Sequence, residues 1–306
     1  MKISVDGGAL NPKNSQRFGT AVFSENLVKA LQLYDKKNQY YIYTFENLKP
    51  KLFWMKGRVS VEEFKQKKGV FLALNQALPL YTSGKIISFC HGLSYHFYPK
   101  FYSAKDVARL NNQLKEMIKR SDKIIVSSKK VKKELVLAGS IKSKIVVLPF
   151  GIPFDMKKGG IKKKKKYFIF VGMNHPIKNI GFIKKAFNEF KKDKKYHDYK
   201  LYVLTKNVTR QKLRKLYQHA TALLTASHYE SFNFPVLEAL SQGCPVIGLK
   251  SAIISELKSY VNLADNSEEF VKNMKKISIK PDVQLINQLY IKFNWKNYIK
   301  NLVRLY

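Results

Sequence analysis

The segment ALLTASHYESFNFPVLEALSQGCPVIGL, residues 222–249, is the part of the chain whose fold the sequence predicts most clearly. Residues 222–227 form a short apolar run bounded by polar residues, which is typical of a buried strand. A polar loop follows over residues 228–233, and residues 244–249 are again apolar. Two buried strands joined by a helix predict a parallel sheet with helices on its faces.

The ends of the intervening helix can be predicted from three residues. Pro235 fits the first helical turn, because proline has no N–H to donate and its φ is already helical. Asn233 stands just before it and is the expected N-cap. Gly243 is expected to end the helix, since glycine is favoured just beyond a helix C-terminus.

Two carboxylates lie in this unit, Glu230 in the loop and Glu238 near the start of the helix. Ligands of open α/β sheets bind outside the carboxyl ends of the strands, where helix N-termini favour phosphate. Glu238 is therefore placed to accept ribose hydroxyls, and Glu230 to reach a sugar. The alternative is that both are solvated surface residues.

The segment YESFNFPVLEAL, residues 229–240, followed by GCPVI, residues 243–247, resembles the signature of family 4 glycosyltransferases. The resemblance implies an α/β protein of the GT-B fold, with two Rossmann-like domains facing across a cleft. It implies a retaining enzyme that uses a nucleotide-diphosphate sugar and needs no metal or other cofactor. Glu238 would then hold the donor ribose, and Glu230, a catalytic residue, would contact the transferred sugar.

The resemblance also assigns a set of donor-binding residues, namely Gly19, Gly172, Lys178, Ser231, Phe232 and Asn233. Lys178 and Gly172 would hold the donor diphosphate, and Gly19 would let the first loop approach the donor. Ile177 stands where the family usually has arginine, so one cation is missing unless His175 or another lysine replaces it. Ser231 and Asn233 stand where the family usually has glycine. Plain loop and surface roles remain the alternatives.

His91 follows an apolar run, residues 85–90, that predicts a strand. The family has a histidine there, in the cleft near the donor sugar, and often an aspartate next to it. Gly92 takes the place of that aspartate. The resemblance predicts a catalytic cleft role for His91, whereas a lone histidine after a strand is more often structural or solvated. Residues 70–80, just before this segment, suggest a helix.

The 306 residues are enough for two domains. We expect an acceptor-binding Rossmann-like domain over 1–156, a basic linker over 157–166, a donor-binding Rossmann-like domain over 167–290, and a helix over 291–306 that crosses back to the first domain. The linker prediction rests on glycines and a run of five lysines without apolar periodicity.

The chain carries 57 basic and 21 acidic residues, a net charge of +36. Such a field attracts anions of many kinds, so a nucleic-acid-binding protein is one alternative function. The basic residues are dispersed and no nucleic-acid-binding motif occurs, so no specific nucleic acid is expected. A non-catalytic nucleotide-sugar binder is a further alternative, suggested by Gly92, Ile177 and Ser231. A lysine-rich proteome would also explain the excess.

The resemblance and the charge together predict synthesis of a surface glycan or glycolipid, an acceptor that is lipid-linked, and peripheral contact with an anionic membrane. Phe53 and Trp54 are the expected anchors. The expected basic contacts are Lys49, Lys51, Lys56, Arg58, Lys65, Lys67, Lys68, Lys129, Lys130, Lys132, Lys133 and residues 162–166. Each lysine near an anionic leaflet contributes about 1 kcal/mol.

The remaining expectations concern location and metals. Cys90 and Cys244 lie in apolar, strand-like contexts, which suits a reduced, cytoplasmic protein. With the membrane contact predicted above, the expected location is the inner face of the membrane. No signal peptide or membrane-spanning run is recognised. The sequence contains no Asp-x-Asp, no zinc-type spacing of cysteine and histidine, and no P-loop, so no metal is expected.

Overall fold

The computed structural model describes residues 1–10, 19–48, 53–156, 162–206, 208–278 and 282–306. The chain divides into two compact units. Unit 1 comprises residues 1–150 together with 295–306, and unit 2 comprises residues 151–294. Residues 157–161 of the predicted linker, and Lys49 and Lys51 of the predicted membrane contacts, lie outside the described residues.

Unit 1 is built on a parallel sheet of six strands in the order β2-β1-β3-β4-β5-β6. The strands are β1 (Lys2–Asp6), β2 (Gln39–Tyr43), β3 (Val70–Ala73), β4 (Lys85–Cys90), β5 (Lys123–Val126) and β6 (Ile145–Val147). Ile3 of β1 pairs with Tyr40 on one side and Val70 on the other. The central strands β1, β3, β4 and β5 are buried along nearly their whole length because helices cover both faces of the sheet.

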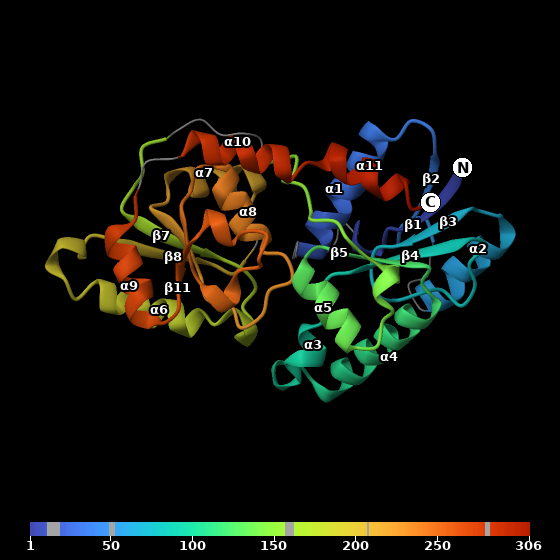
Figure 1. Ribbon diagram of the computed structural model, residues 1–306, viewed down its shortest axis with the longest axis horizontal. Helices are drawn as coiled ribbons and strands as arrows, with labels where there is room; N and C mark the ends of the chain where they lie inside the picture. Colours follow the sequence, from blue (N-terminus) through green and yellow to red (C-terminus); the bar gives the residue numbers. More distant parts are fainter. Residues whose placement is uncertain (11–18, 49–52, 157–161, 207, 279–281) are drawn as a thin grey trace. The chain divides into compact units, whose positions relative to one another are not determined.

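The helices of unit 1 lie in two layers. They are α1 (Gly19–Tyr34), the π-helix η2 (Trp54–Val59), α2 (Ser60–Lys65), α3 (Ser94–Phe97), α4 (Ala104–Arg120), α5 (Lys129–Leu137) and α11 (Trp295–Val303), with short 3₁₀ turns between them. Helices α1 and α11 cover one face of the sheet, and α4 and α5 cover the other (Figure 1). Phe23 of α1 is fully buried and contacts Trp295 and Tyr298 of α11, with ring centroids 6.1 and 6.3 Å away.

Unit 2 has a parallel sheet of five strands in the order β11-β10-β9-β7-β8. Its elements are β7 (Tyr167–Val171), α6 (Ile180–Phe190), β8 (Lys200–Leu204), α7 (Arg210–His219), β9 (Ala222–Thr225), α8 (Phe234–Ser241), β10 (Val246–Leu249), β11 (Asn262–Ala264), α9 (Ser267–Lys276) and α10 (Val283–Lys292). Helices α6 and α9 pack on one face through an aromatic core that includes Phe168, Phe190 and Phe270, and α7, α8 and α10 lie on the other (Figure 1).

Each sheet reverses its winding direction once. In unit 1 the chain passes from β1 to β2 on one side, and later adds β3 on the other. In unit 2 it passes from β7 to β8, and later adds β9 on the other side of β7. Ligands of open α/β sheets bind at such switch points, outside the carboxyl ends of the strands. The loops after β1 and β3, and those after β7 and β9, therefore lie where sites are expected.

The strand–helix–strand prediction for residues 222–249 is confirmed by β9, α8 and β10. The two strands, β9 and β10, pair in parallel. Pro235 is in the first turn of α8, and Gly243 has a φ of +68° just beyond its end, as predicted. The helix predicted over residues 70–80 is wrong, because residues 70–73 form the buried strand β3. A short apolar run of this kind fits either structure.

Candidate functional site

The two loops at the switch point of unit 2 bring Lys178 and Glu230 together. Lys178 follows β7 in a 3₁₀ turn, and Glu230 lies in the loop after β9. The lysine Nζ donates to Glu230 Oε1 over 2.7 Å, and the two side chains are only 18% and 14% exposed. Residues 52 positions apart in the chain thus form a half-buried ion pair at the carboxyl edge of the sheet.

Backbone and side-chain contacts fix this pair in place. The amide N–H of His228 donates to the carbonyl of Ile177 over 2.8 Å, which joins the two loops directly. The Ser227 hydroxyl donates to Glu230 Oε1 over 2.7 Å. Ile177, which stands where the family usually has arginine, is 3% exposed. Its side chain packs into the interior, so this position provides no cation. The nearby His175 ring accepts from the Ile177 N–H through Nδ1.

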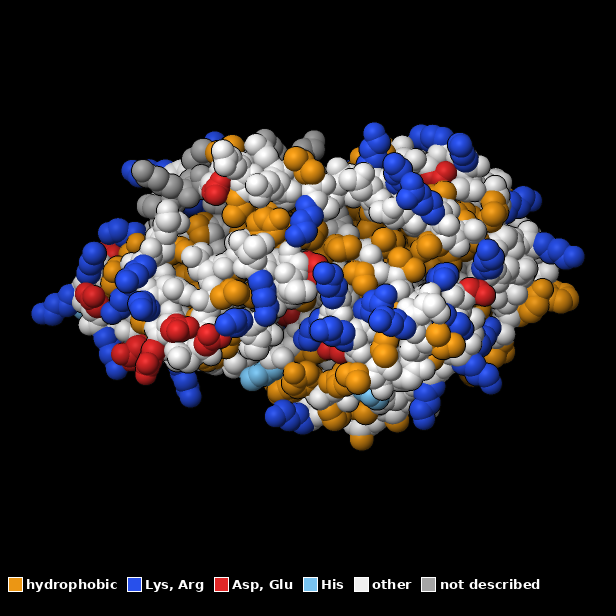
Figure 2. Space-filling model, viewed as in Figure 1, with side chains coloured by type: hydrophobic (Ala, Val, Ile, Leu, Met, Phe, Trp, Pro, Cys, Tyr) orange, Lys and Arg blue, Asp and Glu red, His pale blue; other side chains and the backbone are white. Residues whose placement is uncertain are grey.

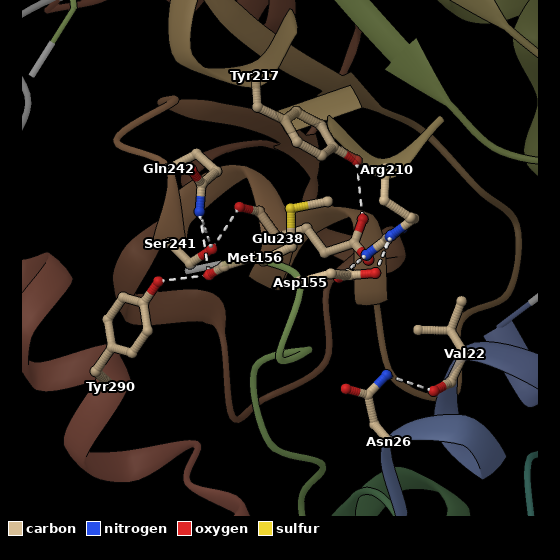
Figure 3. A network of polar contacts seen from close by, with 10 residues as sticks. All are labelled: Val22, Asn26, Asp155, Met156, Arg210, Tyr217, Glu238, Ser241, Gln242 and Tyr290. Carbon is tan, nitrogen blue, oxygen red and sulfur yellow. Dashed lines mark hydrogen bonds and ion pairs between the residues drawn. The ribbon is translucent and has the colours of Figure 1, made fainter. Parts of the chain in front are cut away.

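Glu238 lies inside a separate polar network (Figure 3). Arg210, at the start of α7, donates to Glu238 over 2.6 Å and makes two bonds of 2.8 and 2.9 Å to Asp155. The hydroxyl of Tyr217 donates to the other Glu238 oxygen over 3.3 Å. Glu238 is 3% exposed, and burial raises its pKa, although the Arg210 charge opposes this. Arg210, Asp155 and Tyr217 had no signal in the sequence, because their contacts join distant segments.

The loop residues assigned to the donor have different surroundings. Asn233 is buried, and its side chain binds the carbonyl of Ala252 over 2.9 Å and the N–H of Ile254 over 3.2 Å. Asn233 is the N-cap residue of α8, as predicted, but its side chain makes no capping bond, because these contacts occupy the amide. Phe232 is buried against Phe234 and Phe293, while Ser231 is partly exposed.

The two glycines assigned to the donor stand at element ends. Gly172 follows β7, where an added Cβ would lie 2.9 Å from the Phe170 ring, so a larger residue would displace that ring. Gly19 is the first residue of α1 in unit 1. The structure therefore places Lys178, Glu230, Glu238, Gly172 and the 231–233 loop in unit 2, and Gly19 and His91 in unit 1.

His91 follows β4 at the carboxyl edge of the unit 1 sheet. Its Nε2 is 2.8 Å from the carbonyl of Leu74. Because a carbonyl can only accept, Nε2 carries the proton and Nδ1 is left as the acceptor. Burial lowers the pKa of His91 to about 4, so the ring is neutral at neutral pH. Its ring packs edge-on against Phe23, with centroids 4.9 Å apart.

A cavity of about 450 Å³ opens beside His91 within unit 1. It lies at the switch point of this sheet, and such volumes are common for ligand sites. Its lining comprises Asp6, Gly8, Ala9, Thr20, Phe45, Trp54, Met55, Asn75, Gln76, Ala77, His91, Gly92, Tyr95, Arg109, Leu110 and Gln113. Asp6 ends the first strand, directly before two glycines, which is the signal that could have identified it from the sequence.

Trp54 corrects one membrane prediction. It is 6% exposed and packs against Phe45 with ring centroids 4.7 Å apart, so it is not a surface anchor. Lys68 is also buried, where it pairs with Glu63 and Tyr43, whereas Phe53 is 75% exposed. Lysines and arginines are spread over the face shown in Figure 2, without a single dominant patch.

Cys90 and Cys244 are buried free thiols. Within the described residues, no helix has the length and apolar character needed to cross a bilayer.

The fold is shared with solved glycosyltransferase structures. Sucrose-phosphate synthase from Thermosynechococcus elongatus aligns with a TM-score of 0.74 and 13% identity, covering 100% of this chain and 98% of that one. HepE from Anabaena, in complex with UDP and glucose, gives 0.68 and 12%, covering 100% and 99%. The lipopolysaccharide outer core galactosyltransferase WaaB gives 0.61 and 15%, covering 99% of each chain. The fold is therefore GT-B, as predicted.

The sequence comparisons cover a smaller part of the chain. A search of curated proteins gave no match. Residues 165–278, which contain the strands of the unit 2 sheet, match the family model of glycosyl transferases group 1. This segment holds Lys178, Glu230 and Glu238, and also Arg210, which donates to Glu238. The resemblance predicted from the sequence is confirmed there, because residues 165–278 are similar to the glycosyl transferases group 1.

Proposed function

We propose that the protein is a retaining, metal-independent glycosyltransferase that moves a sugar from a nucleotide-diphosphate sugar to an acceptor hydroxyl. The observation that carries the proposal is the Lys178–Glu230 pair at the switch point of unit 2. A cation and a carboxylate held together at the carboxyl edge of a sheet match the two ends of such a donor, its diphosphate and its sugar. UDP-sugars are the first donors to test, because HepE has been solved with UDP-glucose.

The chemistry assigns each group a separate task. The bond between the anomeric carbon and the diphosphate breaks with its electron pair on the phosphate oxygen. The acceptor oxygen bonds to the same face of that carbon, and its proton passes to the leaving diphosphate. Lys178, now paired with Glu230, would turn to the diphosphate and stabilise its growing charge. Glu230, released from the lysine, would bind the sugar hydroxyls.

The other assigned residues keep supporting roles in this proposal. Glu238 would hold the ribose, and Arg210 would keep the buried carboxylate ionised. Gly172 and the loop of Ser231, Phe232 and Asn233 would shape the donor site, and Gly19 the approach of the first loop. His91 would contact the transferred sugar through Nδ1, as a neutral acceptor of a hydroxyl proton.

The proposal extends to the acceptor and to location. We place the acceptor on unit 1 and suggest a lipid-linked glycan, with the enzyme cytoplasmic and peripheral at the inner face of an anionic membrane. Support comes from the exposed apolar side chains near α2, where Phe53 and Phe64 are 75% and 76% exposed beside Arg58, Lys65 and Lys67.

Calorimetric titration with UDP tests the donor site. Lys178→Met should weaken UDP binding about tenfold or more, because a charge-assisted bond to phosphate is lost. The control is Lys185→Met, which removes the same charge from an exposed position on α6. Glu238→Gln should weaken UDP binding but leave the affinity for inorganic pyrophosphate unchanged. Equal effects of Lys178→Met and Lys185→Met would contradict the assignment.

Turnover separates the enzyme from the alternatives. Release of UDP from a panel of UDP-sugars should persist in excess EDTA, and NMR of the product should show the donor's anomeric configuration. A requirement for Mn²⁺, or an inverted product, would contradict the proposed reaction. Tight UDP binding without turnover would favour a non-catalytic binder. Salt-dependent binding of RNA without UDP binding would favour a nucleic-acid-binding protein.

A further inference from the structure

Both oxygens of Glu238, the residue proposed to hold the donor ribose, already accept a hydrogen bond (Figure 3). Oε2 accepts from the hydroxyl of Tyr217, which is fully buried. Oε1 accepts from Nη2 of Arg210, whose side chain is 17% exposed against 4% for Glu238. The Arg210 side of the carboxylate is therefore its more open side, and a ribose hydroxyl has to reach Glu238 beside Arg210.

Arg210 makes more bonds to Asp155 than to Glu238. Its Nε donates to Asp155 Oδ2 over 2.8 Å, and its Nη2 donates to Asp155 Oδ1 over 2.9 Å. Only one bond, of 2.6 Å from the same Nη2, reaches Glu238. Two parallel bonds between a guanidinium and a carboxylate fix the orientation of the guanidinium. The bond to Glu238 can therefore be replaced while Asp155 keeps Arg210 in place.

The backbone next to Asp155 is itself held by hydrogen bonds. The following residue, Met156, is fully buried, and its N–H donates to the carbonyl of Pro153 over 2.8 Å. The Met156 carbonyl accepts from the Tyr290 hydroxyl over 2.7 Å and from the Gln242 side chain over 3.3 Å (Figure 3). The Asp155 side chain is 39% exposed. Its carboxylate thus has a fixed position, although it can be changed without opening the core.

A ribose hydroxyl is suited to insert between Arg210 and Glu238, because a hydroxyl both donates and accepts hydrogen bonds. It would donate to Glu238 Oε1 and accept from Arg210 Nη2, in place of their direct bond. Without Asp155, this insertion would separate a largely buried guanidinium from its carboxylate, which is costly. With Asp155, the two charge-assisted bonds to Arg210 persist.

We propose that Asp155 is a positioning residue for the donor, which holds Arg210 in place while a ribose hydroxyl inserts between Arg210 and Glu238. Asp155 acts through Arg210 and does not contact the nucleotide. The inference rests on the proposed function, since it takes Glu238 as the ribose residue. It goes further, because the affinity for a ribonucleoside diphosphate then depends on a carboxylate outside residues 165–278, the part that matches the family model.

The binding of two nucleotides to Asp155→Asn tests the proposal. The variant keeps the shape of the side chain and one acceptor, but it loses the charge and the second bond to Arg210. Calorimetry should show that UDP binds about fivefold or more weakly than to the wild type. The affinity for 2′,3′-dideoxyuridine diphosphate should be unchanged, because this ligand lacks the hydroxyls and leaves the Arg210–Glu238 bond intact.

A double-mutant cycle tests whether Asp155 acts through Arg210. In the Arg210→Gln background, Asp155→Asn should change the affinity for UDP by less than about twofold, since its partner is gone. Asp198→Asn is the matched control, because Asp198 is another exposed aspartate of unit 2 and pairs with Lys166 instead. This control should leave the affinity for both nucleotides unchanged.

The outcomes distinguish this inference from the proposed function. Weaker binding of UDP but not of the dideoxy nucleotide, with no further loss in the Arg210→Gln background, supports the role of Asp155. If Arg210→Gln fails to fold, the comparison of the two nucleotides decides alone. Equal effects of Asp155→Asn on both nucleotides, or no effect on UDP, overturn the inference, and so does an undiminished effect in the Arg210→Gln background.

In these cases the proposed function still stands, provided that Lys178→Met weakens UDP binding. If the wild type binds no UDP, the proposed function fails and this inference fails with it.

Discussion

A buried carboxylate, Asp6, and a half-buried imidazole, His91, line the same cavity of unit 1, and loss of solvent moves their pKa values in opposite directions. The pKa of Asp6 is raised to about 6 and that of His91 is lowered to about 4. In both cases the cause is the cost of a charge away from water. Each residue therefore links stability to pH with its own sign.

His91 should make the protein less stable in acid. Its ordinary pKa is 6.5 and its folded pKa about 4, so between these values the unfolded chain binds more protons. Stability then falls as pH falls through this window. His91→Gln keeps a donor for the Leu74 carbonyl but does not titrate. Between about pH 7 and about pH 5 the wild type should lose roughly 2 kcal/mol more stability than the variant.

Denaturant unfolding at each pH measures this difference, and His96→Gln serves as the control on the short helix α3. Equal pH dependence of the wild type and His91→Gln would show that the His91 ring is not buried in its neutral form. Asp6 has the opposite linkage, because its folded pKa is above its ordinary value of 3.8. The stability it contributes is present in acid and is lost as pH rises through about 6.

Individual residues also show what the sequence can and cannot reveal. Lys178 and Glu230 were identifiable because the resemblance named them, and the structure brings them within 2.7 Å. Their roles toward a donor stay predictions. Arg210 was not identifiable, because its bonds to Asp155 and Glu238 join three separated segments. A single arginine at the start of a helix has no local feature that indicates two carboxylate partners.

Elements were predictable where several local signals agree. For residues 222–249 an apolar run, a proline in the first helical turn and a terminal glycine all favour one arrangement, and β9, α8 and β10 follow it. At residues 70–80 one apolar run stood alone, and pairing with β1 and β4 decides for the strand β3. Such pairing depends on distant residues, which the local sequence does not contain.

The membrane prediction depends on side chains exposed on helix α2 and next to it. Phe64 and Val61 on α2 are 76% and 50% exposed, and the Phe64 ring packs edge-on against Tyr81. Arg58 and Lys65 are exposed close by, so apolar and basic side chains share this surface. An anionic bilayer interface matches both, through apolar insertion and attraction of charge.

Replacing Val61 and Phe64 by serine should reduce sedimentation with anionic vesicles several-fold. High salt should reverse binding of the wild type, since screening weakens attraction to the head groups. The control is Ile291→Ser, which removes a side chain of unit 2 that is 72% exposed. Equal sedimentation of the wild type with neutral and anionic vesicles at low salt would sink this prediction.

Unit 1 contains two separate parts of the chain, residues 1–150 and 295–306. Trp295 and Tyr298 of α11 complete the aromatic cluster around Phe23. Trp295→Ala should therefore destabilise unit 1 by about 3–5 kcal/mol. Hydrogen exchange should show lost protection in β1 to β6 and unchanged protection in β7 to β11. Equal loss in both sheets would show that the two units unfold together.

The return of α11 to unit 1 also sets an order of events on the ribosome. Strands β1 to β6 are synthesised first, but the helix that covers Phe23 follows all of unit 2. Because domains generally fold as units during synthesis, unit 2 can finish folding while unit 1 still lacks part of its cover. The N-terminal half of the nascent chain is therefore the half that most needs protection by chaperones, although it emerges first.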